Sequence, residues 1–154
     1  MFKIIIAFII CTFSITNTSI AADLNKPEEA VAMVKKAITH YQKFGKEKTL
    51  AEVSKLKGPF VDKEMFTVIM DAKGVVLAHG FEHKMIGKNI MEMRDHEGTA
   101  MVKDMFRITK DKDSGWTHYK FPNPMTRAIE QKSTYVEKYD GLMFFCGIHT
   151  SKKL

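Results

Sequence analysis

The C-terminal part of the chain most limits the fold, because three runs of β-type residues follow one another with short connections. The runs span residues 116–121, 131–138 and 142–148. Tyr139-Asp140-Gly141 forms the second turn, and Asn123-Pro124 lies in the first connection. Strands joined by hairpins pair antiparallel, so the sequence predicts an antiparallel sheet at this end of the chain.

The middle of the chain adds two strands and a helix. Runs at 65–70 and 75–79 are joined by Asp71-Ala72-Lys73-Gly74, which is typical of a turn. Residues 99–110 then predict a helix in the crossover between the second and third strands. Its inward side chains are expected to be Met101, Val102, Met105 and Phe106. The expected fold class is α+β, with a five-stranded antiparallel sheet and a helix-containing crossover.

Two helices are expected before the first strand. Pro27-Glu28-Glu29 begins a long helix well, since proline suits the first turn and the acids oppose the positive end of the macrodipole. Apolar residues repeat at spacings of three and four up to Gly45, which is the natural stop. Thr49-Leu50-Ala51-Glu52 resembles a capping box and predicts a second, short helix that ends at Gly58-Pro59.

Residues 1–21 are predicted to be a secretory signal peptide. Met1-Phe2-Lys3 places one positive charge before the apolar residues 4–10, and Ser19 and Ala21 stand at the −3 and −1 positions of a cleavage site after Ala21. The alternative is an uncleaved anchor, but polar residues at 12, 14, 16 and 17 interrupt the apolar stretch. We therefore expect residues 22–154 to form one periplasmic or secreted domain without a membrane span.

Charge and cysteine content narrow the class of partner. The formal net charge of +6 falls to +5 when Lys3 is removed, and the lysines are scattered among acids. Neither the charge pattern nor export favours nucleic-acid binding. Removal of the signal peptide leaves Cys146 alone, so no intrachain disulfide can form. Because Cys146 lies within an apolar run, we expect a buried, inert thiol.

Familiar catalytic and metal-binding patterns are missing from the sequence. The chain has no CxxC, HExxH, GxSxG or Walker motif. His79 and His83 are four residues apart, but Gly80 between them argues against a helix that would present both to one metal ion. We therefore expect a protein that is not an enzyme and that carries neither a metal nor a cofactor.

A cluster of aromatic and basic residues lies instead on the third and fourth strands. Its members are Trp116, His118, Tyr119, Lys120, Lys132 and Tyr135. Apolar walls with a few convergent donors suit a pocket for a short organic acid. Strand alternation opposes a single site for all of them, because Trp116 and Tyr119 face opposite sides, as do Lys132 and Tyr135. The plainer alternative is that the aromatic rings are core and the lysines are solvated.

Several segments, taken in order, resemble a single Cache domain. They are 71–79, 86–89 with 94–95, 115–124 and 132–136, and the resemblance runs from about Val31 to Ile148. It implies an extracytoplasmic sensor module in which a long N-terminal helix packs on a PAS-like antiparallel sheet. Domains of this type often bind acetate, propionate, lactate or pyruvate, so a carboxylate ligand of this class is expected.

The resemblance also implies a set of ligand-binding residues. His79, Trp116, Tyr119, Lys132 and Tyr135 match family positions near the ligand, and Arg107 is a further candidate partner for a carboxylate. Family members usually belong to chemoreceptors or kinases, whereas here we expect a separate, exported domain that serves a membrane receptor or transporter. The alternative is a protein-interaction module with a filled pocket, acting as an accessory subunit of such a receptor.

Overall fold

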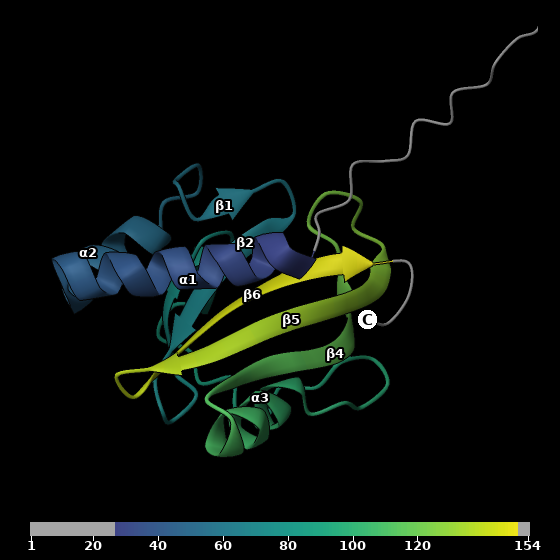
Figure 1. Cartoon of the computed structure of the whole chain (residues 1–154). Coiled ribbons are helices and arrows are strands. Elements are labelled where there is room, and N and C mark those ends of the chain that lie inside the picture. Colours follow the sequence, from purple (N-terminus) through teal and green to yellow (C-terminus); the bar gives the residue numbers. More distant parts are fainter. Residues whose placement is uncertain (1–26, 151–154) are drawn as a thin grey trace, which may run out of the picture.

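The computed structural model describes residues 27–150, which form an antiparallel sheet with helices on both of its faces (Figure 1). Helix α1 packs along β5 and β6 on one face, and helix α3 lies against β4 and β5 on the other. The proposed signal peptide and its cleavage point after Ala21 lie outside the described residues.

The sheet has six strands; the order β1-β2-β6-β5-β4 includes five of them, and β3 also pairs with β2. The strands are β1 (Val61–Asp62), β2 (Met65–Met70), β3 (Val76–His79), β4 (Ser114–Pro122), β5 (Ile129–Tyr139) and β6 (Leu142–Thr150). All these pairings are antiparallel, which confirms the α+β fold class. The expected count of five strands omitted β1, whose two residues are too few to show an alternating pattern.

The helices are α1 (Pro27–Phe44), α2 (Lys46–Val53), the single 3₁₀ turn η1 (His83–Met85) and α3 (Met101–Asp111). The limits of α1 match those expected from Pro27 and Gly45. The expected capping box at Thr49 is wrong, because α2 has already begun at Lys46. The Thr49 hydroxyl donates a hydrogen bond of 2.9 Å to the Gly45 carbonyl and lies 2.8 Å from His40 Nδ1, so it acts inside the helix. Within residues 27–150 no helix has the length and apolar character needed to cross a bilayer.

The sheet separates two apolar layers because successive strand residues point to opposite faces. Ile69 and Phe144 face α1, while their neighbours Val68 and Phe145 face α3. Cys146 is fully buried in the α1 layer, as expected, and burial raises the pKa of its thiol to about 12. The thiol is therefore protonated at neutral pH and poorly nucleophilic.

Candidate functional site

A cavity of about 500 Å³ opens in the second layer, between the sheet and the segment that contains η1 and α3. Its walls come from β2, β3 and β6, the segment from η1 to α3, the ends of β4 and β5, and the loop between those two strands. Three residues expected at a ligand site line it: His79, Tyr119 and Lys132. Trp116, Tyr135 and Arg107 do not line it.

Lys132 reaches the cavity by crossing the face of the neighbouring strand β6. A Cβ atom at Gly147 would lie 2.4 Å from Lys132 Cε, so the missing side chain leaves the space through which the lysine passes. Beyond β6, the Lys132 ammonium lies 4.6 Å from the ring centre of Phe66 and 5.6 Å from that of Phe121. The side chain thus ends over two aromatic faces rather than in solvent.

The Lys132 ammonium has no direct ion-pair partner among the described residues, although the buried Glu64 carboxylate attracts it at longer range. Only 5% of Lys132 is exposed, and among residues 27–150 its Nζ forms neither a hydrogen bond nor an ion pair. Burial lowers the pKa of Lys132 to about 8, so most molecules carry the positive charge at pH 7. A buried charge without a partner is costly, and an anion that enters the cavity would relieve that cost.

His79, at the end of β3, lines the same cavity. Its Nδ1 accepts hydrogen bonds from the backbone N–H groups of Phe81 (3.2 Å) and Glu82 (2.9 Å). Burial and the nearby Lys132 charge lower the pKa of His79 to about 4, so the ring is neutral at pH 7. Because Nδ1 is an acceptor, we assign the single ring proton to Nε2. The ring stacks on Phe66 with centroids 4.9 Å apart, which fixes its orientation.

Tyr119 forms part of the wall directly opposite Lys132 in the β4–β5 pairing. Its hydroxyl lies 2.8 Å from Thr134 Oγ1, and burial raises the pKa of the phenol to about 12. Tyr119 is therefore neutral at any physiological pH. Its hydroxyl already has a partner, so the residue contributes mainly shape and an apolar face.

His149 lies beside Lys132 as its partner in the β5–β6 pairing. It is 1% exposed, and neither ring nitrogen has a hydrogen-bond partner among the described residues. Burial, followed by the Lys132 charge, lowers the pKa of His149 to about 4. A neutral imidazole cannot balance the lysine charge, so the site remains cationic.

Trp116 and Tyr135 form a pair on the opposite face of the sheet. They face each other across β4 and β5 with ring centroids 5.5 Å apart and pack in the α1 layer. The Tyr135 hydroxyl donates a hydrogen bond of 2.9 Å to Glu137, and Glu137 pairs with Lys35 of α1 at 3.4 Å. These residues join α1 to the sheet and do not meet Lys132.

Arg107 lies on the solvent side of α3. Its Nη2 is 3.3 Å from Asp104 Oδ1, and it borders a separate pocket of about 480 Å³ together with Lys110 and Lys138. His83 is also apart from the cavity, and its Nε2 contacts the carbonyl oxygen of Ser54. Within residues 27–150 no three His, Cys, Asp or Glu side chains are grouped so that they could hold a metal ion.

Sequence reasoning did not find the apolar part of the cavity. Met85, Met93, Met101 and Met105 line it, together with Ile90. Met85, Ile90 and Met93 lie between residues 80 and 98, where the apolar residues follow no regular spacing. Only Met101 and Met105 carried a signal, since they occupy the inward face of α3.

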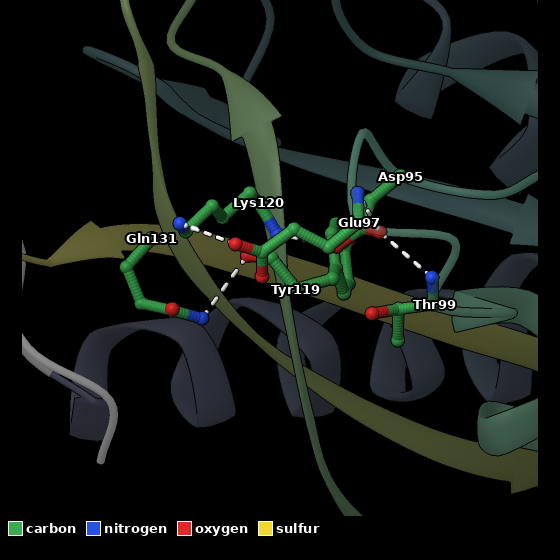
Figure 2. Close-up of polar contacts among 6 residues, drawn as sticks. All are labelled: Asp95, Glu97, Thr99, Tyr119, Lys120 and Gln131. Carbon is green, nitrogen blue, oxygen red and sulfur yellow. Dashed lines mark hydrogen bonds and ion pairs between the residues drawn. The ribbon is translucent and has the colours of Figure 1, made fainter.

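The segment that carries these side chains is tied to the edge strand β4 (Figure 2). Asp95 accepts hydrogen bonds from the backbone N–H of Lys120 (2.9 Å) and of Thr99 (2.7 Å), and the Lys120 ammonium donates one of 2.6 Å to Glu97. Burial opposes ionisation of Asp95, but the backbone N–H groups outweigh it and hold its pKa below the usual value. These bonds position the start of α3 over the sheet and so help to define the cavity wall.

Three solved structures are similar to this chain. A methyl-accepting chemotaxis protein from Vibrio parahaemolyticus is 19% identical, with a TM-score of 0.67 over 79% of this chain and 86% of that one. A Cache chemosensory domain described for carboxylic acid recognition is 22% identical, with a TM-score of 0.68 over 80% and 92% of the two chains. A periplasmic sensor domain of a chemotaxis protein is 18% identical, with a TM-score of 0.62 over 80% and 89%.

At these identities the similarity establishes a shared fold, which is that of Cache sensor domains. No curated protein sequence matches the chain. The sequence profile of the family described as Single Cache domain 2 matches residues 9–147, which is most of the chain. With the antiparallel sheet, the helix α1 on one face and the cavity on the other, the chain belongs to the single Cache domain 2 family of extracytoplasmic sensor domains.

Proposed function

We propose that this chain is a non-enzymatic domain that binds a small organic carboxylate outside the cytoplasm. The observation that carries the proposal is the Lys132 ammonium, which is buried beside an apolar cavity and forms neither an ion pair nor a hydrogen bond among the described residues. A carboxylate supplies the missing negative charge, and its carbon chain occupies the apolar part of the cavity.

In the proposed complex two donors hold the carboxylate. The Lys132 ammonium provides the charge, and the Nε2–H group of His79 provides a second, neutral donor. Phe66 contacts both side chains, since its ring stacks on His79 and the Lys132 ammonium lies over it, and it therefore helps to keep both in place. Charge-assisted hydrogen bonds in a poorly hydrated site are stronger than those at a surface.

Two further observations support ligand binding over an interaction module with a filled pocket. The cavity of about 500 Å³ is not occupied by the protein's own side chains. One of the similar structures is described as a Cache chemosensory domain that recognises carboxylic acids. By analogy, we propose that the acid-loaded domain serves a membrane receptor or transporter in signal transduction, as in chemotaxis.

A thermal-shift screen tests binding. The panel contains acetate, propionate, lactate, pyruvate and longer aliphatic and aromatic monocarboxylates at millimolar concentration. We expect at least one acid to raise the melting temperature, because a ligand that binds the native state stabilises it. If no acid in the panel raises the melting temperature, the proposed function is wrong.

Lys132→Met then tests the proposed site, with Lys138→Met as the matched control on the same strand. Methionine keeps the apolar stem, so we expect Lys132→Met to melt no lower than wild type without ligand, since an unpaired buried charge is gone. Its affinity for the acid should fall by about thirtyfold or more. Lys138 is exposed and does not line the cavity, so Lys138→Met should bind the acid as wild type does. Equal affinities of the two variants would reject the role of Lys132.

A further inference from the structure

We infer that the ligand is an amphipathic monocarboxylate with an aliphatic or aromatic body of about six to ten carbons, rather than a two- or three-carbon acid. This inference rests on the proposed function, because it takes the carboxylate to be held at Lys132. It concerns the size and the apolar walls of the cavity, which the charge of Lys132 does not explain.

The volume of the cavity is the first argument. About 500 Å³ corresponds to roughly sixteen water molecules at about 30 Å³ each. Acetate has four non-hydrogen atoms and would fill about a quarter of that volume. The remaining space would have to hold water. A body of six to ten carbons fills most of it and still leaves room at the open side.

The chemistry of the walls is the second argument. Away from Lys132 and His79, most side chains that border the cavity are apolar, among them Val68, Val102 and Phe145. Water gains few hydrogen bonds against such walls, so its replacement by methylene groups is favourable. A short acid would leave this gain unused.

The distribution of charge limits the ligand to one carboxylate. Of the described residues that border the cavity, Lys132 is the buried cation. Arg127 and Glu82 are exposed, and their charges are opposite to each other. A second carboxylate at the far end of the ligand would meet methionine and valine side chains. The free-energy cost of removing this second carboxylate from water would then not be offset by a hydrogen bond or an ion pair.

The methionines make the walls adaptable. Met85, Met93, Met101 and Met105 have flexible, polarisable side chains that can repack around ligands of different shape. We therefore expect a class of related acids to bind, with preference set by apolar volume rather than by one arrangement of substituents.

Isothermal titration of the full domain with acetate, butyrate, hexanoate and octanoate tests this inference. We expect the dissociation constant to fall about three- to fourfold for each added methylene up to octanoate. Hexanamide and adipate are the matched controls for hexanoate. Hexanamide lacks the negative charge, adipate adds a second one, and both should bind at least tenfold more weakly.

The outcomes separate the two proposals. If acetate or butyrate binds as tightly as hexanoate, the amphipathic ligand is rejected while carboxylate binding at Lys132 stands. If adipate binds as tightly as hexanoate, the restriction to one carboxylate is rejected, and carboxylate binding at Lys132 again stands. If hexanamide equals hexanoate, or if no acid of any length binds, the proposed function itself is rejected.

Discussion

At the scale of single residues, Lys132 is held in a state that costs folding free energy. Its stem crosses Gly147 and its ammonium lies on Phe66, where it forms no ion pair among residues 27–150 and Glu64 only partly offsets the cost of burial. Neutral His79 and neutral His149 flank it, and their own pKa values are lowered to about 4. Such unfavourable placement of a charge is characteristic of functional sites, where stability is exchanged for ligand affinity.

The pKa of Lys132 predicts how ligand affinity depends on pH. In the free protein this pKa is about 8, and a bound carboxylate raises it because it stabilises the ammonium. Affinity should therefore be nearly constant from pH 6 to 7 and fall as the pH rises through about 8. Above pH 8 binding should take up protons, up to one per site.

Titration calorimetry at pH 6.5, 8 and 9.5 measures this dependence, with buffers of different ionisation enthalpy to count the protons. Lys132→Met is the control, and its residual binding should show no proton uptake in this range. An affinity for wild type that is unchanged up to pH 9.5 would contradict a charged Lys132 as the partner of the carboxylate.

At the scale of elements, strand β6 determines whether Lys132 can reach the cavity. The backbone of Gly147 does not have the positive φ angle that favours glycine. Its role is therefore to leave space. A methyl group there would lie 2.4 Å from Lys132 Cε and 2.5 Å from Thr134 Oγ1. The Thr134 hydroxyl in turn contacts that of Tyr119, so the wall of the cavity would also be disturbed.

Gly147→Ala should therefore weaken acid binding by tenfold or more and destabilise the domain by about 1–3 kcal/mol through overpacking. Urea unfolding and calorimetry measure the two effects. In a Lys132→Ala background the same change should cost less stability, because one of the two clashing side chains is gone. Equal costs in both backgrounds would mean that the lysine does not pass over residue 147.

At the scale of the whole molecule, the two faces of one sheet have different tasks. The face under α1 forms a closed core that includes Trp116 and Tyr135, while the face under α3 contains the cavity. The crossover that covers the cavity is fastened to β4 through Asp95 and Glu97. Ligand binding can thus depend on one layer while the other maintains the fold.

Export is a property of the whole chain and can be tested directly. Expressed in a Gram-negative host with a C-terminal tag, the protein should be recovered from the periplasm with Ala22 as its first residue by mass spectrometry. Ala21→Arg removes the small residue before the proposed cut and should leave the uncleaved chain in the membrane fraction. Recovery of uncleaved wild-type chain from that fraction would instead indicate a membrane anchor.

Most of the secondary structure was predictable because its signals are local. The turn Tyr139-Asp140-Gly141, the alternation in the strands and the limits of α1 all appear as predicted. The errors concern single short segments. They arise where a contact with another part of the chain, and not the local sequence pattern, determines the structure. Thr49 binds His40 and the Gly45 carbonyl instead of capping a helix, and β1 exists only because two residues pair with β2.

The sequence by itself determined the antiparallel α+β fold, and strand alternation already separated Trp116 from Tyr119 and Lys132 from Tyr135. Periodicity says which residues share a face, but not which face holds a cavity. Only the tertiary structure decided that Lys132 and His79 meet there, because they lie 53 residues apart (132 − 79) and meet only once β2 and β6 lie between β3 and β5. It also revealed the role of Gly147, since space for a neighbouring side chain depends on packing across strands.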